Sequence, residues 1–311
     1  SYYSQNIDTT VMTNGVVYVV AKIYDAVGNF TYSPKQRYMC DNQGPEQVKN
    51  VKCIAVDGTT ATLSWSDVSD DDISYFVVEC KQSDGVWKSV SRTSTNLGVN
   101  LSGLTPEHDY VYRVIGYDKR SNRGTPSEEI TVTTLKDTIC PKVTKITPDP
   151  GYFKSEINLR FTAEDDYRVK SIEIQTSTDK ESWKTVSEIK ATGESAKCTF
   201  DCKLDLKNYE EGSVFVRAKV YDSYGNVTED KDLTCYEYVV DRTAPIQPTG
   251  VTASSGETEG GSSFVNISWN AITDDNSFAY YRVYKSNSAD GEFTLLKNNV
   301  KTVNTYDENV D

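Results

Sequence analysis

The sequence is almost devoid of histidine, with only His108 among 311 residues. Ser–His and Cys–His catalytic pairs, and the common zinc sites, all require imidazole groups, so these sites lack their base or ligands here. A glycosidase would need two carboxylates facing each other across a cleft, which slender β modules rarely provide. We therefore predict that the chain is not an enzyme, and we expect no cofactor.

Basic blocks and long apolar runs are also missing. The 33 Lys and Arg residues are outnumbered by 46 Asp and Glu residues, and the formal net charge is -13. This balance removes the attraction that drives binding to nucleic acids and anionic lipids. No apolar run approaches the roughly 20 residues that cross a bilayer. We expect neither a nucleic-acid partner nor membrane insertion.

The sequence begins with SYYSQNIDTT, which has no initiator methionine and no signal-peptide pattern. We therefore expect a fragment of a longer protein.

The seven cysteines are odd in number and include no CxxC pair. Cys198 and Cys202 share one strand parity with Phe200, which predicts that they are small buried hydrophobic residues. Four residues of extended strand separate them by about 13 Å, too far for a disulfide between them. This pattern favours packing over a metal or redox site.

An internal repeat organises the chain. AKIYDAVGN at 21–29 and AKVYDSYGN at 218–226 differ at three positions, and each copy runs on to a similar exit, YMCDNQGP or YVVDRTAP. After each exit comes a second type of module, with alternating apolar residues that end at Trp65 or Trp269 and an acidic turn beyond. Two module types therefore alternate along the chain.

This order predicts the module boundaries. We expect the C-terminal part of a first-type module, a complete second-type module, a complete first-type module and the N-terminal part of a second-type module, at 1–42, 43–135, 136–242 and 243–311. Pro45, Pro141 and Pro245 lie at the junctions, which predicts short, stiff connectors. Residues 254–263, SSGETEGGSS, are predicted to form a hairpin loop inside the last module.

Alternation of apolar and polar residues in runs of five to ten, broken by Gly, Asp, Asn and Pro, is typical of antiparallel strands. No segment has a sustained helical stripe. The clearest inward-facing sets are Ile157, Leu159, Phe161 and Ala163, and Val214, Val216, Ala218 and Val220. The predicted fold class is all-β, with tandem antiparallel β-sandwiches arranged as beads on a string.

One module type resembles a known family. The stretch LTPEHDYVYRVIGYD, with Leu104, Pro106 and Tyr110 at the family's spacing, is similar to the second half of a fibronectin type III module. The resemblance covers most of 45–135 and 245–311. It implies that Tyr110 is a corner tyrosine whose hydroxyl bonds to upstream backbone, and that Trp65 is buried.

The other module type is similar to immunoglobulin-like repeats of large bacterial surface proteins. Its mark is a Val-rich strand followed by Asp222, Gly225 and Asn226, and the partial copy repeats the motif from Asp25 to Asn29. The pattern predicts a tight hairpin in which glycine takes a positive φ and the aspartate caps the turn.

The predicted function is a non-catalytic spacer and presentation segment of a large multimodular bacterial protein, extracellular and either secreted or associated with the cell wall. Each module would contact mainly its neighbours in the chain. The alternatives are adhesion or carbohydrate binding with an unknown protein or glycan ligand, and accessory modules of a glycan-degrading enzyme or of an RHS-type wall-associated protein.

Two candidate sites stay open beside that prediction, although ordinary turns and edge packing are the favoured explanations. Clustered carboxylates suit calcium, and they occur at Asp165 and Asp166, at Asp70 to Asp72, and at Asp274 and Asp275. Exposed rings can stack on sugars, and Trp87 and Trp183 fall at equivalent points of an outer strand in the two module types.

Overall fold

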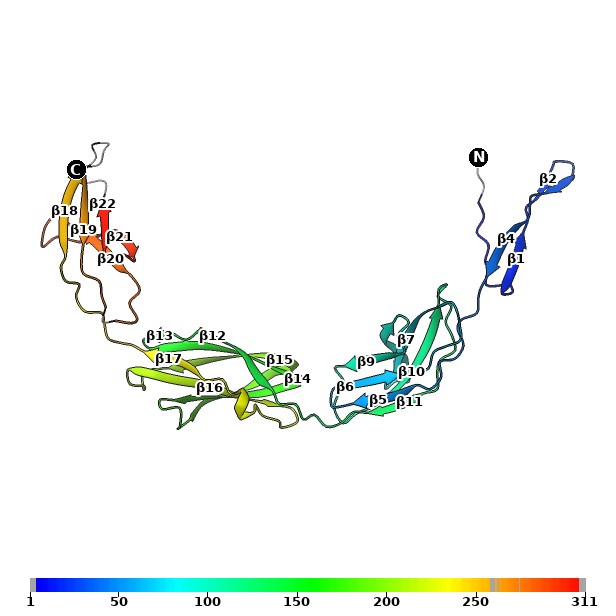
Figure 1. The fold of residues 1–311 in the computed structure, drawn as a ribbon, viewed down its shortest axis with the longest axis horizontal. Helices are drawn as coiled ribbons and strands as arrows, with labels where there is room; N and C mark the ends of the chain where they lie inside the picture. Colours follow the sequence, from blue (N-terminus) through cyan, green and yellow to red (C-terminus); the bar gives the residue numbers. More distant parts are fainter. Residues whose placement is uncertain (1–3, 258–260, 262, 274, 308–311) are drawn as a thin grey trace.

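The computed structural model describes residues 4–257, 261, 263–273 and 275–307. Within these ranges the regular elements are β-strands, apart from one 3-10 turn at Asp230–Asp232. Figure 1 shows the strands gathered into groups that follow one another along the chain in a bent row. The all-β prediction is confirmed. No helix within the described ranges has the length and apolar character needed to cross a bilayer.

The N-terminal group (residues 15–40) consists of two antiparallel pairs. The pairs are β1 with β4 and β2 with β3, at Gly15–Val19, Gln36–Cys40, Lys22–Tyr24 and Phe30–Tyr32. Large apolar side chains on these strands remain exposed, including Tyr18 at 62% and Phe30 at 55%. In the described part of this group, neither pair of strands covers these side chains.

The second group (residues 52–133) is a two-layer sandwich. One sheet has the order β5-β6-β9, at Lys52–Val56, Thr60–Ser64 and Gly98–Ser102. The other has the order β11-β10-β7-β8, at Ile130–Thr133, Asp109–Asp118, Ile73–Lys81 and Trp87–Thr93. All paired neighbours are antiparallel.

The core of the second group follows the alternation in the sequence. Leu63 and Trp65 point inward from the first sheet, and Phe76 meets the Trp65 ring from the second at 5.6 Å between centroids. Burying each side chain of this size stabilises the fold by about 1.5–3 kcal/mol. Tyr110 accepts a 2.8 Å hydrogen bond from the Thr105 backbone N–H through its hydroxyl, so the predicted corner tyrosine is confirmed.

The third group (residues 142–240) is built around two bent strands of 22 residues each, β14 at Glu156–Ser177 and β15 at Lys184–Asp205. The remaining strands are β12, β13, β16 and β17, at Lys142–Thr147, Tyr152–Phe153, Gly212–Asp222 and Tyr236–Val240. The first half of β14 pairs with β12 and its second half pairs with β16, while the pairing of β14 with β15 shifts register between Glu164 and Val169. All six strands are joined in one bent sheet with the order β12-β14-β16-β17-β13, and β15 pairs with β14 off this path.

Both halves of β14 bury their alternate residues in one core. Ile157, Leu159, Phe161 and Ala163 are at most 1% exposed, and the alternating valines of β16 lie opposite them. On β15, Cys202 is buried and Cys198 packs half-buried against the same core. All seven cysteines are free thiols, and this pair acts as the small hydrophobic residues that were predicted.

The C-terminal group (residues 252–307) has two small sheets. One has the order β18-β19-β22 and the other pairs β20 with β21, at Thr252–Glu257, Ser263–Ser268, Asn304–Asp307, Tyr281–Lys285 and Thr294–Val300. Trp269 is 8% exposed, as its match to Trp65 predicted. The loop predicted at 254–263 is shorter, because residues up to Glu257 pair with β19. Residues 258–260 and 262 lie outside the described ranges.

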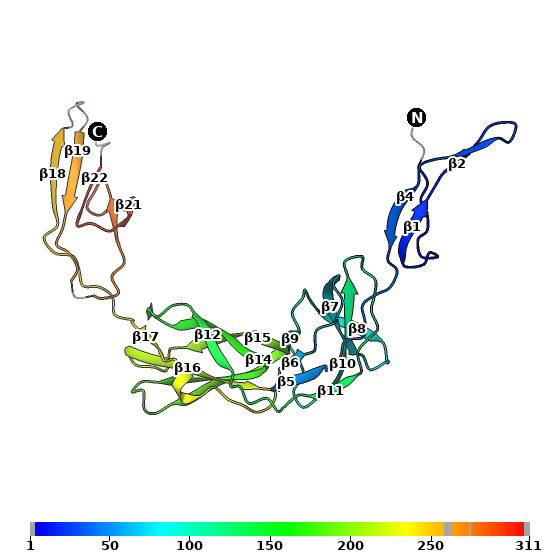
Figure 2. The ribbon, with the colours of Figure 1, turned by 45° about the vertical axis from the view of Figure 1, so that its right-hand side comes forward.

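The buried apolar residues of the second and third groups form two separate clusters that share no member. One runs from Val48 to Val132 and the other from Ile146 to Val240. In the described residues, neither core continues across Pro141. Figure 2 shows the same succession of strand groups from a second direction.

Candidate functional site

The connector between the second and third groups carries direct contacts from both sides. We call residues 135–141, together with the loops that meet there, the central junction. The Thr59 hydroxyl donates a 2.7 Å hydrogen bond to Asp166 Oδ2 across it. The Tyr224 hydroxyl donates a 3.1 Å hydrogen bond to the carbonyl of Pro106. These contacts fix how one module meets the next.

Asp137 lies in the connector itself and is only 1% exposed. Its Oδ1 accepts the Ile139 backbone N–H at 3.0 Å, and its carbonyl accepts the Asn226 side-chain amide at 3.2 Å. A Cβ on Gly58 would lie 3.0 Å from the Asp137 Cα, so glycine at that position permits the close approach. Asp137 Oδ2 is buried without a hydrogen-bond partner.

Three carboxylates converge at this point, and we call Asp137, Asp165 and Asp222 the Asp137 cluster. One oxygen from each lies within 4.8 Å of the others. Asp222 is fully buried and holds the predicted turn, because its oxygens accept hydrogen bonds from the backbone and side chain of Asn226. Asp165 Oδ2 accepts backbone N–H groups, whereas its Oδ1 is buried and unpartnered.

The environment of the cluster disfavours the charged form of two of its carboxylates. Burial raises the pKa of Asp165 to about 6, and the carboxylates of Asp166, Asp137 and Asp222 add to this effect. Burial likewise raises the pKa of Asp137 above its ordinary value. Concentrating negative charge away from water is costly unless a proton or a cation compensates it. Oxygen ligands of this type are those that hard divalent cations take.

A counterpart lies at the equivalent end of the second group, formed by Asp41, Asp72 and Asp118, which we call the Asp41 cluster. Asn122 donates its side-chain amide to the carbonyl of Asp41 at 3.0 Å, as Asn226 does to that of Asp137. This cluster is less buried, and the Arg120 guanidinium lies 3.7 Å from Asp41 Oδ2. A hydrogen bond with Asp70 raises the pKa of Asp72 to about 6, with nearby carboxylates adding to it.

Only some of the carboxylates that the sequence indicated as candidate calcium ligands lie in a cluster. Asp165 and Asp72 each join a cluster, whereas Asp166 instead bonds to Thr59. Asp275 caps its own loop by accepting the Ser277 N–H at 2.7 Å, and Asp274 lies outside the described residues. Asp70 and Asp71 are not members of either cluster.

Sequence reasoning missed Asp41, Asp118 and Asp137, and it treated Asp222 only as a turn residue. A usable signal was present, because the Asp-x-x-x-Asn spacing of 222–226 recurs at 25–29 and at 118–122. Each connector also contains an aspartate whose side chain accepts a hydrogen bond from the backbone N–H of the second residue after it. These aspartates are Asp41, Asp137 and Asp241.

The two outer tryptophans are covered by arginines in the same way. The guanidinium of Arg113 lies 4.0 Å from the Trp87 ring centroid, and that of Arg217 lies 4.0 Å from the Trp183 centroid. Arg113 is held in place by a 2.6 Å ion pair with Glu79. One face of each ring is therefore occupied by its own module. This packing favours edge coverage over sugar stacking.

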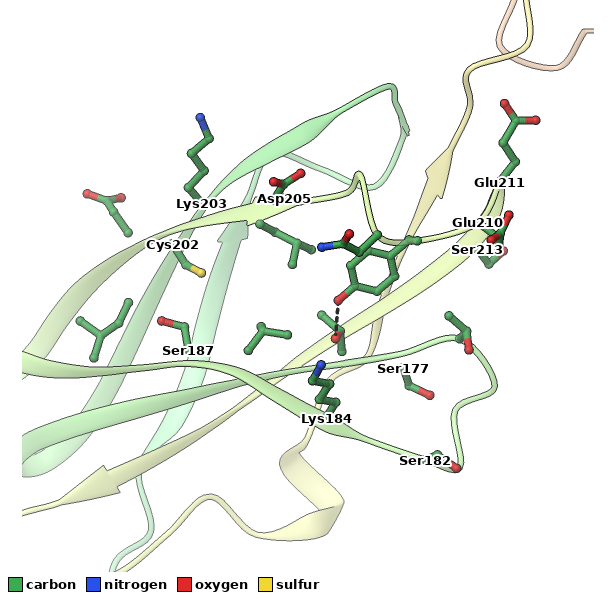
Figure 3. Close-up of a pocket in the computed structure, with 18 residues that line it drawn as sticks. Ser177, Ser182, Lys184, Ser187, Cys202, Lys203, Asp205, Glu210, Glu211 and Ser213 are labelled. Carbon is green, nitrogen blue, oxygen red and sulfur yellow. Dashed lines mark hydrogen bonds between the residues drawn. The ribbon is translucent and has the colours of Figure 1, made fainter.

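An open hollow lies beside β15 in the third group (Figure 3). Both halves of β15 and the turn that follows it line the hollow. Tyr209 and Thr176 are among the lining residues, and their hydroxyls lie 2.8 Å apart. The lining is mostly serine, lysine and carboxylate side chains.

The groups around this hollow are poorly suited to catalysis. The Ser177 hydroxyl bonds to Asp179, but a backbone hydrogen bond from Ser182, aided by Ser177 and Glu181, lowers the pKa of Asp179 to about 2. Such a carboxylate is a weak general base. Burial raises the pKa of the Cys202 thiol, which disfavours the reactive thiolate.

Comparison with known proteins identifies one domain of the chain. Residues 46–133 match the fibronectin type III domain family. Domains of this family are generally non-catalytic scaffold modules of multidomain chains. The match contains both the buried Trp65 and the corner Tyr110.

Several solved structures are similar to parts of the chain. The FN1–FN3 domains of chicken CNTN1 are 16% identical, with 86% of this chain and 89% of that chain covered and a TM-score of 0.40. A domain of human fibronectin type III domain containing protein 3 is 25% identical over 31% of this chain and 92% of that chain, with a TM-score of 0.29. The FN5 domain of Drosophila Lar is 21% identical, with 30% of this chain and 99% of that chain covered and a TM-score of 0.26.

Proposed function

We propose that this chain is a non-catalytic spacer and presentation segment of a large multimodular bacterial protein, secreted or held at the cell surface. The fibronectin type III domain at 46–133 supports a modular scaffold. The alternation with modules that resemble bacterial immunoglobulin-like repeats supports the bacterial assignment. The net charge of -13 disfavours nucleic acid and anionic lipid as partners.

The observation that carries the proposal is the central junction. Two separate cores meet there through a connector of few residues, and side chains from both modules hydrogen-bond across it. A Gly/Ser-rich tether would leave the modules free to reorient, whereas short contacts of this kind limit their motion. Length then grows with each added module, which is the property that a spacer needs.

Small-angle X-ray scattering on the whole chain tests this proposal. A compact globule of this length would have a radius of gyration of about 19 Å. We expect a clearly larger value and an elongated distance distribution. A variant with a Gly/Ser insertion after Thr138 is the control, and it should give a broader distribution than the parent. A compact profile for the parent chain would contradict the spacer.

A glycan and extracellular-matrix array tests the competing function. Silence of the whole chain across the array is expected for a spacer. Selective binding that is lost when loop residues are changed would overturn the proposal in favour of adhesion. The arginines that cover Trp87 and Trp183 leave less ring surface for sugar, which is why we expect silence.

A further inference from the structure

We propose that the Asp137 cluster binds one hard divalent cation, with calcium as the preferred ion. The cation would tie the connector to the third group. One oxygen from each of its three carboxylates lies within 4.8 Å of the others. Two of the cluster's oxygens, Asp137 Oδ2 and Asp165 Oδ1, are buried and make no hydrogen bond. Buried polar atoms are nearly always partnered, so each of these two needs an explanation. A single cation between them supplies the partner for both.

The ligand chemistry selects the class of ion. The converging atoms are all carboxylate oxygens, and hard cations bind oxygen in preference to nitrogen or sulfur. Calcium accepts irregular sets of six to eight oxygens, whereas magnesium demands near-octahedral geometry and gives up water reluctantly. Asp137 and Asp222 are at most 1% exposed, which leaves little room for a full magnesium hydration shell. The site therefore fits calcium better than magnesium.

The carboxylates are already held in position. Asp222 is oriented by the N–H groups of its own turn, Asp165 by those of Tyr167 and Arg168, and Asp137 by that of Ile139. Little side-chain ordering is then required on binding, which favours affinity. The guanidinium of Arg168, which follows Asp165 by three residues, is engaged at 2.9 Å by Glu194.

The position of the cluster gives the ion a mechanical role. Asp137 belongs to the connector, whereas Asp165 lies within β14 of the third group and Asp222 is the last residue of β16. The residue after Asp165 bonds to Thr59 of the fibronectin domain, and Tyr224, in the turn of Asp222, bonds to Pro106. A bound cation would fasten the connector to the end of the third group that already contacts the preceding module, and so would stiffen the central junction.

The Asp41 cluster offers an internal comparison and is assigned no ion. Its oxygens also lie within 4.8 Å of one another, but Arg120 lies beside Asp41 and no carboxylate of that cluster is among the buried, unpartnered atoms of the described residues. The positive charge that the Asp137 cluster lacks is partly supplied there by the protein.

The test is calorimetry on the whole chain after removal of metals with chelator. We expect heat on titration with calcium, and a rise of several degrees in the melting temperature of one transition, smaller with magnesium. Terbium should give luminescence sensitised by Tyr167 and Tyr224, whose ring centroids lie 5.8 Å apart beside the cluster. Calcium should quench that signal by displacement.

Variants locate the site. Asp165→Asn should raise the melting temperature of the metal-free protein, because it removes a buried charge, and should abolish the shift with calcium. Asp137→Asn should abolish the shift as well. The exposed Asp149→Asn, in the same module, should behave as the parent. Far-UV circular dichroism checks that each variant is folded.

Two outcomes would overturn the proposal. One is the absence of heat and of any melting shift with millimolar calcium. The other is a calcium response that survives in both Asp165→Asn and Asp137→Asn. Loss of that surviving response in Asp72→Asn would place the ion at the Asp41 cluster.

Discussion

In the second and third groups, a tyrosine hydroxyl forms a hydrogen bond with the backbone of a surface turn. Tyr110 accepts the N–H of Thr105, and Tyr238 of the third group donates to the carbonyl of Pro148 at 2.9 Å. Each ring belongs to the core region of its own module, so the hydroxyl ties a surface turn to the packed interior. Both modules use a single polar atom for this purpose.

Tyr110→Phe should destabilise the fibronectin domain by about 1–2 kcal/mol, because it leaves the Thr105 N–H without its partner while keeping the ring. Urea unfolding followed by tryptophan fluorescence measures the effect. Tyr117→Phe is the control, since its ring stacks on Tyr75 and its hydroxyl is not part of the corner. Equal losses in both variants would contradict a special role for Tyr110.

The lowered pKa of Asp179 should make the stability of the third group depend on pH. Its pKa is about 2 in the folded chain, below the value of 3.8 expected for an ordinary aspartate. The unfolded chain therefore takes up this proton first as the pH falls, and the stabilisation is present above pH 4 and lost towards pH 2. In Asp179→Asn this part of the pH dependence should vanish.

The measurement is urea unfolding of the parent and of Asp179→Asn between pH 2 and pH 5. The difference between the two curves isolates this residue from the other carboxylates. A difference that stays constant across this range would show that Asp179 has an ordinary pKa.

At the scale of elements, the Asp-x-x-x-Asn hairpin turn is used in the N-terminal, second and third groups. The fourth position takes a left-handed conformation in each copy, with φ of +93° at Gly28, +91° at Gly225 and +68° at Ser121. Glycine adopts this conformation without strain, whereas Ser121 bears a steric cost. The turn is retained at Ser121 because Asp118 and Asn122 make the same capping bonds.

Gly225→Ala should destabilise the third group by about 1–2 kcal/mol, since a Cβ is unfavourable at positive φ. Gly193→Ala in β15 is the matched control, because a Cβ there would meet no atom within 4 Å and its backbone is not left-handed. Differential scanning calorimetry compares the two variants. Similar melting temperatures for both would refute the backbone argument.

The strands were predicted well where alternation was clean, as in Ile157 to Ala163 and Val214 to Val220. The continuity of β14 and β15 through a bend was not predicted. The bend falls at Glu164 to Val169, where polar residues interrupt the alternation and the sequence looks like a loop. The strand continues through the bend because β14 pairs with β12 before it and with β16 after it.

At the scale of the whole molecule, the central junction determines how the modules are oriented. Gly58→Val should disturb it, because the added carbons would press on the Asp137 backbone. The two cores should stay folded, since neither includes Gly58. We expect a broader distance distribution in small-angle scattering, with unchanged circular dichroism.

Gly193→Val serves as the control for this junction variant, because its site is open and distant in sequence from the connector. Its scattering profile should match that of the parent. A Gly58→Val profile that also matches the parent would mean that the connector does not set the orientation.

The sequence by itself determined the features that depend on local order: alternating strands, a capped turn, a corner tyrosine and buried tryptophans. Their causes act over a few residues, so a one-dimensional pattern contains them. The module boundaries at 42, 135 and 242 stay predictions of the same kind. Only the tertiary structure decided which carboxylates meet and which rings are covered. Asp137, Asp165 and Asp222 are far apart along the chain, and their convergence and loss of water exist only when connector, bent strand and hairpin pack together.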